Sequence, residues 1–126
     1  MKKILKTLFV LFISILVLGC ENDNTSKVGT MESISSSEVK EIMDNNDKSY
    51  ILIDVREDYE FKEGHIPGAV NIPLGNITKV DYSLDKILIV YCRSGNRSNQ
   101  AAIKLKNMGY NVKDMGGILD WTYEIE

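Results

Sequence analysis

The sequence predicts an α/β sandwich with a mostly parallel sheet. Short runs rich in β-branched residues alternate along the chain with segments whose apolar residues have helical spacing. After the first 20 residues, the most apolar run is 86–91 (KILIVY), which is almost continuous rather than alternating. Such a run is typical of a central strand covered on both faces. The segment 31–126 is also long enough to bury one hydrophobic core.

Signals for the first helix begin at Ser35. This residue is a good amino-terminal cap, and Glu38, three residues later, completes a capping box. The apolar residues within 39–43 then share one helical face, and the polar run 44–47 (DNND) ends the helix.

Two strands and a short helix follow. Residues 50–55 form a β-rich run, and 58–63 predicts one or two helical turns that end at Gly64. Residues 69–72, between two prolines, predict a second short strand, and 86–91 predicts the central one.

In the last third of the domain, predicted helices and strands again alternate. Residues 97–108 carry apolar side chains at helical spacing, and 111–115 predicts a last strand. We expect the glycine pair 116–117 to turn the chain into a final helix that begins at about Ile118 and carries Trp121, which is expected to pack in the core.

Composition excludes several functional classes. The chain has 126 residues with a net charge of −3, whereas a nucleic-acid-binding domain is expected to carry a basic stripe. It has one histidine, which excludes a multi-histidine metal site, and two cysteines, which allow at most one disulfide.

The first 20 residues differ from the rest. They carry three lysines and no acid, whereas the remainder has 12 basic and 18 acidic side chains. A cationic start followed by the apolar run 8–19 is the order of a secretory signal peptide, and this run is shorter than the roughly 20 residues that span a membrane. The end of the run, Gly19–Cys20, resembles a bacterial lipobox. We expect a signal peptide over 1–19 and a lipid on Cys20; an uncleaved anchor or a core helix are the alternatives.

The stretch 21–30 is polar and lacks aromatic residues, so it buries too little apolar surface to fold by itself. We therefore expect residues 20–30 to be a lipidated cysteine with a polar tether, and 31–126 to be one domain. The expected location is the outer side of a bacterial cell membrane. A lipid on Cys20 leaves Cys92 without a disulfide partner, which is unusual outside the cytosol.

Cys92 follows the central predicted strand and precedes the helix of 97–108. Sites of open α/β sheets lie at the carboxyl ends of strands, and amide N–H groups at a helix amino terminus favour an anion. Arg93 and Arg97 add two positive charges, and Gly95 permits a tight turn. All of these features favour a thiolate at Cys92; the alternative is a structural cysteine with solvated arginines.

The loop Cys92–Ser98 resembles the active-site loop of single-domain rhodanese-like proteins. Two further segments agree with that family in order along the chain: 53–73 (IDVREDYEFKEGHIPGAVNIP) is similar to its amino-terminal signature, and 109–121 (GYNVKDMGGILDW) to its carboxyl-terminal one. The resemblance implies a rhodanese-like three-layer sandwich over 31–126, with helices flanking the sheet, and no metal or cofactor.

By this resemblance, Cys92 is the nucleophile of a thiosulfate sulfurtransferase, which takes sulfane sulfur from thiosulfate or a polysulfide and passes it to a thiol or cyanide. The substrate-binding residues are those of the cradle that follows: Arg93, Ser94, Gly95, Asn96, Arg97 and Ser98. Asp54 and Arg56 match a family element in which a structural ion pair is the expected role. His65 is expected to hold a turn.

Two other functions compete with this one. The first is a non-catalytic rhodanese-like module that binds a partner or senses redox state at the membrane surface. The second is a cysteine phosphatase, but those enzymes place five residues between cysteine and arginine, whereas four separate Cys92 from Arg97. A loop one residue shorter makes a cradle better sized for a sulfur atom than for phosphate.

Overall fold

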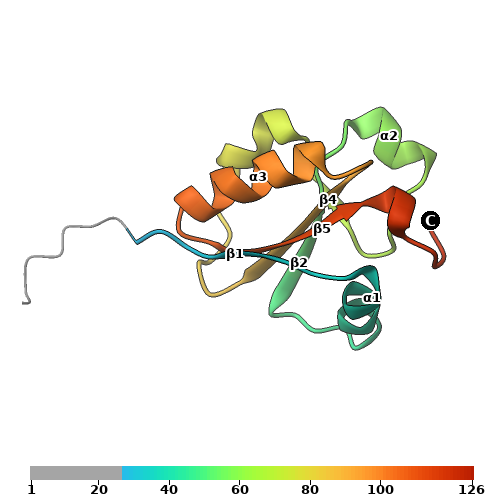
Figure 1. Cartoon of the computed structure of the whole chain (residues 1–126), viewed down its shortest axis with the longest axis horizontal. Helices are drawn as coiled ribbons and strands as arrows, with labels where there is room; N and C mark the ends of the chain where they lie inside the picture. Colours follow the sequence, from blue (N-terminus) through green and yellow to red (C-terminus); the bar gives the residue numbers. More distant parts are fainter. Residues whose placement is uncertain (1–26) are drawn as a thin grey trace, which may run out of the picture.

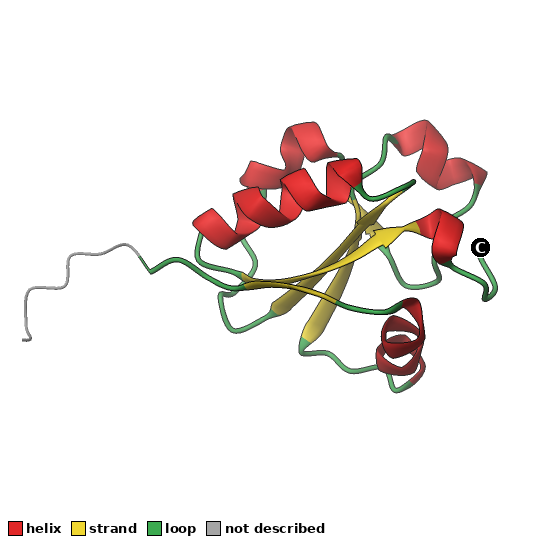
Figure 2. Cartoon of the chain, in the orientation of Figure 1, coloured by secondary structure: helices red, strands yellow, loops and turns green. Residues whose placement is uncertain are grey.

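The computed structural model describes residues 27–126, which form a twisted sheet with helices on both faces (Figures 1 and 2). The elements in chain order are β1 (Met31–Ser33), α1 (Ser36–Asp44), β2 (Tyr50–Asp54), α2 (Asp58–Glu63), β3 (Val70–Asn71), the 3-10 helix η1 (Leu74–Lys79), β4 (Ile87–Cys92), α3 (Asn96–Asn107), β5 (Asn111–Gly117) and the 3-10 helix η2 (Ile118–Asp120).

The described strands form one parallel sheet in the order β1-β5-β4-β2-β3. β4, the most apolar strand, lies at the centre, where both of its edges are paired. The predicted α/β sandwich is confirmed, and the sheet is wholly parallel in residues 27–126. Because parallel strands end at the same edge, the carboxyl ends of β2, β4 and β5 meet there. Cys92 pairs with Gly117 at this edge.

The two faces of the sheet bury separate apolar clusters. Side chains alternate along β4, so that Leu88, Val90 and Cys92 pack in one cluster with α3 and η1, while Ile89 and Tyr91 pack in the other with α1. Figure 2 shows α3 and α1 on opposite sides of the sheet. The continuous apolar run of β4 therefore reflects burial on both faces.

The predicted helices begin close to their sequence signals. Ser35 precedes α1, and its side-chain oxygen accepts a hydrogen bond from the backbone N–H of Glu38 at 3.2 Å. α2 spans Asp58–Glu63 as predicted and is followed by Gly64. α3 begins directly after Gly95, one residue before the predicted start.

The predicted final helix is confirmed only at its start. η2 begins at Ile118 as predicted, but it is a 3-10 turn that ends at Asp120, before Trp121, and residues 121–126 form neither helix nor strand. The backbone N–H of His65 donates to the carbonyl of Glu126 at 3.0 Å, and the N–H of Glu126 donates back to His65 at 2.9 Å. The backbone N–H and C=O of Glu126 are therefore hydrogen-bonded to His65 and not to other residues of a terminal helix. Trp121 is buried in the α1-side cluster, as predicted.

Two elements have no clear sequence signal. β1 has only three residues, and two of them are exposed, so it shows no apolar pattern. It exists because it pairs with β5 at the edge of the sheet. η1 follows Pro73 and buries Ile77 beneath α3.

The predictions for residues 1–19, for Cys20 and for most of the tether fall outside the described residues. Within 27–126, the helices are too short and too polar to cross a bilayer.

Candidate active site

Cys92 is the last residue of β4, and its side chain lies beneath the loop that follows. The residue is 1% exposed and packs in the α3-side cluster. Its Sγ accepts a hydrogen bond from the backbone N–H of Gly95 at 3.0 Å. The sulfur is therefore directed toward a loop amide at the amino terminus of α3.

Two glycines let the loop close over the sulfur. Gly95 has φ of 109°, a left-handed conformation that only glycine adopts without strain, and this turn directs its N–H toward Cys92. Gly117, on the neighbouring strand, lies against the loop backbone, since a Cβ built there would stand 2.3 Å from the carbonyl oxygen of Arg93. That carbonyl accepts the N–H of Leu119 at 3.2 Å.

The other predicted cradle residues divide into buried and exposed groups. Ser98 is fully buried, and its hydroxyl donates to the carbonyl oxygens of Gly95 at 3.1 Å and Gly116 at 3.3 Å. It therefore fastens the first turn of α3 to the end of β5. Ser94 and Asn96 are exposed, and Asn96 accepts a hydrogen bond from Gln100.

The two arginines of the loop have different environments. The guanidinium of Arg97 donates to both carboxylate oxygens of Glu60, at 2.6 and 3.0 Å. Arg93 is exposed, and no ion pair involves it within residues 27–126. Glu60 lies 37 residues before Arg97, on α2. The sequence places Glu60 within the family signature, but only the fold reveals this ion pair.

This ion pair changes the electrostatics of the site. The pKa of Glu60 lies below its ordinary value, chiefly because Arg97 donates hydrogen bonds to the carboxylate. The pKa of Arg97 is raised, first by Glu60 and to a smaller extent by the charge that Cys92 carries when ionised. Much of the charge of Arg97 is thus balanced by Glu60.

Replacing Glu60 by Gln is expected to destabilise the protein at neutral pH by on the order of 1 kcal/mol. Because the pKa of Glu60 is lowered in the folded state, its contribution is complete above the pKa of the unfolded chain. It is lost as the pH falls through the lower, folded value. The stability difference between Glu60→Gln and the parent, measured by urea unfolding, should therefore shrink between about pH 5 and pH 3.

The exposed Glu63→Gln variant is the matched control, because Glu63 lies on the same helix and makes no ion pair within the described residues. It should change stability little at either pH. A Glu60→Gln deficit that stays constant down to pH 3 would contradict the assigned role of the carboxylate charge.

Asp54 and Arg56 form a buried ion pair beside the loop. Asp54 is fully buried at the end of β2, and its carboxylate accepts hydrogen bonds from Arg56 Nε at 3.0 and 3.1 Å and from Nη2 at 2.7 Å. Nη2 also donates to the carbonyl of Gly64 at 2.7 Å. The pair therefore ties the end of β2 to the end of α2, which is the structural role expected from the sequence.

His65 also holds the chain after α2. Its Nδ1 lies 2.8 Å from the carbonyl oxygen of Phe61, and its ring stacks on the Phe61 ring at 3.7 Å. Its Nε2 is 3.4 Å from the carboxylate of Glu126. These contacts agree with the predicted role in holding a turn.

A cavity of about 390 Å³ opens beside the loop. Arg56, Glu60 and Arg93 line it on the side of the loop and α2. The chain after β5 forms the other wall, through Ile118, Leu119, Trp121, Tyr123 and Ile125. Sequence reasoning missed this wall, because it predicted a helix in its place.

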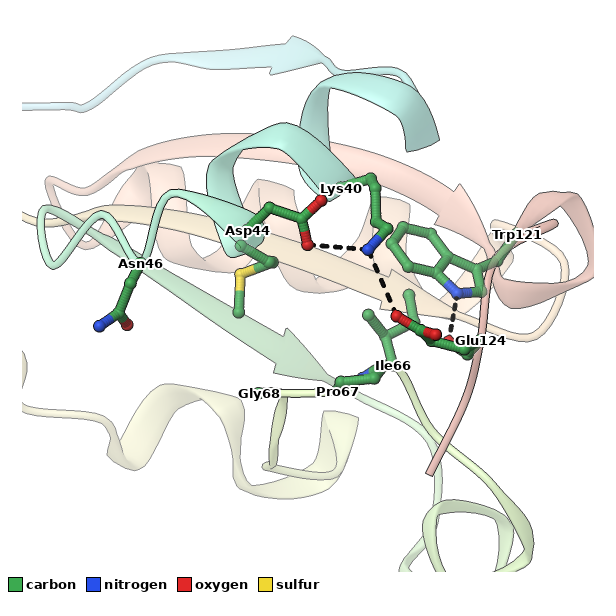
Figure 3. A pocket seen from close by; sticks show the side chains of 9 residues that line it. Lys40, Asp44, Asn46, Ile66, Pro67, Gly68, Trp121 and Glu124 are labelled. Atoms are coloured by element: carbon green, nitrogen blue, oxygen red, sulfur yellow. Dashed lines mark hydrogen bonds and ion pairs between the residues drawn. The ribbon is translucent and has the colours of Figure 1, made fainter.

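A second cavity, of about 250 Å³, lies between α1, the turn 66–68 and the chain around Trp121 (Figure 3). Lys40 Nζ is 2.8 Å from Asp44 and 3.4 Å from Glu124 at its rim. No residue of the loop 92–98 lines this cavity. It is therefore separate from the sulfur, although Trp121 contributes to both cavities. Residues 27–126 bring no group of three metal-ligating side chains together.

Residues 35–124 match the model of a protein family described as the rhodanese-like domain. Among curated proteins, the Bacillus subtilis protein YtwF, named as a candidate sulfurtransferase, is 38% identical over 97 residues, which cover 75% of this chain and 93% of YtwF. YrkF of the same organism, named as a candidate sulfur carrier protein, is 36% identical over 108 residues. The match covers 82% of this chain and only 57% of YrkF.

Solved structures of rhodanese-like proteins resemble this chain as well. A rhodanese-like domain protein from Staphylococcus aureus has a TM-score of 0.68 at 30% identity, and the match covers 76% of this chain and 97% of that one. A rhodanese-related protein from Thermoplasma volcanium has a TM-score of 0.66 at 32% identity, with 75% and 97% covered.

Proposed function

Because the chain belongs to the rhodanese-like domain family, we propose that it is a sulfurtransferase that carries sulfane sulfur on Cys92 as a persulfide. The observation that carries the proposal is the position of the sulfur. Sγ of Cys92 lies at the end of the central strand and accepts the N–H of Gly95 at the start of α3. An amide donor at a helix amino terminus stabilises a thiolate and, after transfer, a persulfide anion.

The reaction has two half-reactions. In the first, the Cys92 thiolate attacks the outer sulfur of thiosulfate, the S–S bond of the donor breaks, and sulfite leaves with the bonding electron pair. In the second, an acceptor thiolate or cyanide attacks the outer sulfur of the persulfide and releases the Cys92 thiolate. Arg93 is exposed without an ion-pair partner in the described residues, so it is the better placed arginine for attracting an anionic donor.

The proposal includes a membrane location. A lipid on Cys20, after removal of residues 1–19, would hold the domain at the outer side of a bacterial membrane through the polar residues that follow Cys20. The donor there would be thiosulfate or a polysulfide. The choice of thiosulfate or a polysulfide as donor, and of a thiol or cyanide as acceptor, belongs to the same proposal.

Peptide mass measurement tests both parts. The full chain is produced in bacteria, purified from membranes, exposed to thiosulfate or polysulfide and digested. We expect the Cys92 peptide to gain about 32 Da, one sulfur atom, and the amino-terminal peptide to begin at a lipidated Cys20. Addition of cyanide should remove the extra sulfur as thiocyanate.

Two matched variants separate these readouts. Cys92→Ser should lose the sulfur adduct and keep the lipid, whereas Cys20→Ser should lose the lipid and keep the adduct. Absence of an adduct with either donor would contradict the sulfurtransferase and favour a non-catalytic binding or redox-sensing module. An unmodified Cys20 in membrane fractions would contradict the anchor alone.

A further inference from the structure

The wall of the cavity beside the loop is formed by exposed apolar side chains. Leu119 is 63% exposed, Ile125 is 55% exposed and Tyr123 is 38% exposed. We call these three residues the apolar rim. All three lie after β5: Leu119 is in η2, where its N–H donates to the carbonyl of Arg93, and Tyr123 and Ile125 precede Glu126, whose backbone pairs with His65. Apolar surface that surrounds a reactive site is typical of a place where a partner binds.

The charges around the rim are mostly paired. Arg56 binds Asp54, and Glu60 binds Arg97. Arg93 remains as the cation of the cavity without an ion pair in the described residues, and Glu63, at the end of α2, is exposed. A partner that brings a carboxylate toward Arg93 and an apolar side chain onto the rim would match this surface.

The loop that covers the sulfur also lines the cavity of the rim. Cys92 is 1% exposed, and Arg93, the next residue, lines this cavity together with the apolar rim. An acceptor that takes sulfur from Cys92 therefore has to approach this loop, and an acceptor seated in the cavity would contact both Arg93 and the rim. Cyanide is too small to contact the rim while it reacts, whereas a cysteine within a polypeptide brings its neighbours with it.

We propose that the acceptor is a protein cysteine with an apolar residue beside it and an acidic residue nearby. This inference rests on the proposed function and specifies its second half-reaction. The acceptor thiolate attacks the outer sulfur of the Cys92 persulfide, the S–S bond of the persulfide breaks, and Cys92 leaves as thiolate. The acceptor becomes the persulfide, so no other oxidant or reductant is needed.

Single-turnover transfer to short peptides tests the inference. The full chain is first loaded with sulfur from thiosulfate, and the persulfide is verified by mass. It is then mixed with a capped pentapeptide Glu-Gly-Cys-Leu-Gly, with the same peptide carrying Ser in place of Leu, or with one carrying Gln in place of Glu. We expect transfer to the Ser peptide to be about tenfold slower. Transfer to the Gln peptide should be about threefold slower at low salt.

Variants of this chain test whether the rim and Arg93 cause the two peptide preferences. Leu119→Ser should remove most of the preference for the Leu peptide, and Arg93→Gln should remove the preference for Glu. Ile103→Ser is the matched control, because Ile103 is a similarly exposed apolar residue of α3 that lies outside the cavity. It should leave both preferences unchanged.

Equal rates for all three peptides would overturn the inference while leaving the proposed function intact. A chain that never forms the persulfide would overturn both. Sedimentation of the Cys20→Ser chain with phosphatidylglycerol vesicles, lost in Leu119→Ser, would assign the rim to a lipid surface and likewise overturn the inference.

Discussion

Asp54→Asn is expected to lower the free energy of unfolding by about 3–5 kcal/mol. Asp54 is fully buried, and its carboxylate accepts three hydrogen bonds from the Arg56 side chain and one from the Arg56 backbone. An amide in its place leaves the guanidinium buried without a counter-charge. Urea unfolding at neutral pH measures the loss.

Two companion variants identify the cause. Asp58→Asn removes an exposed carboxylate 3.7 Å from Lys62 and should cost less than about 1 kcal/mol. The double variant Asp54→Asn with Arg56→Gln removes the uncompensated charge and should recover part of the lost stability. A double variant as unstable as the sum of the two single changes would contradict a role for the buried charge pair.

Gly117→Ala is expected to destabilise the protein by about 2–3 kcal/mol and to slow formation of the Cys92 persulfide about a hundredfold. The new Cβ would stand 2.3 Å from the carbonyl oxygen of Arg93 and 2.8 Å from Cα of Ser94. Both atoms belong to the loop backbone, so the loop has to move away from β5. Gly95 moves with it, and its hydrogen bond to Cys92 lengthens.

Urea unfolding and the time course of the sulfur adduct measure the two effects. Gly75→Ala is the matched control, since a Cβ at Gly75 meets no atom within 4 Å. It should change stability by less than about 0.5 kcal/mol and leave the adduct rate unchanged. Wild-type rates in Gly117→Ala would show that close contact between β5 and the loop does not position the sulfur.

Local signals were sufficient for most of the fold. The continuous apolar run ending at Tyr91 marked the central strand, and Ser35 with Glu38 marked the start of α1. These predictions succeeded because a capping hydrogen bond or burial on both faces depends on neighbours in the sequence. β1 was missed because it is paired to β5, about 80 residues later, and its three residues show no apolar pattern of their own.

Neighbouring residues were enough to predict that Cys92 ends the central strand and that a glycine-containing loop leads from it into a helix, because an apolar run, a glycine and helical spacing can each be recognised within a short segment. The ion pair of Glu60 with Arg97, and the wall that Leu119, Tyr123 and Ile125 form in the cavity next to Arg93, could be found only in the folded chain. The physical reason is that Coulomb and packing energies depend on distance in space. The packing of α2 and the last residues against the sheet sets those distances.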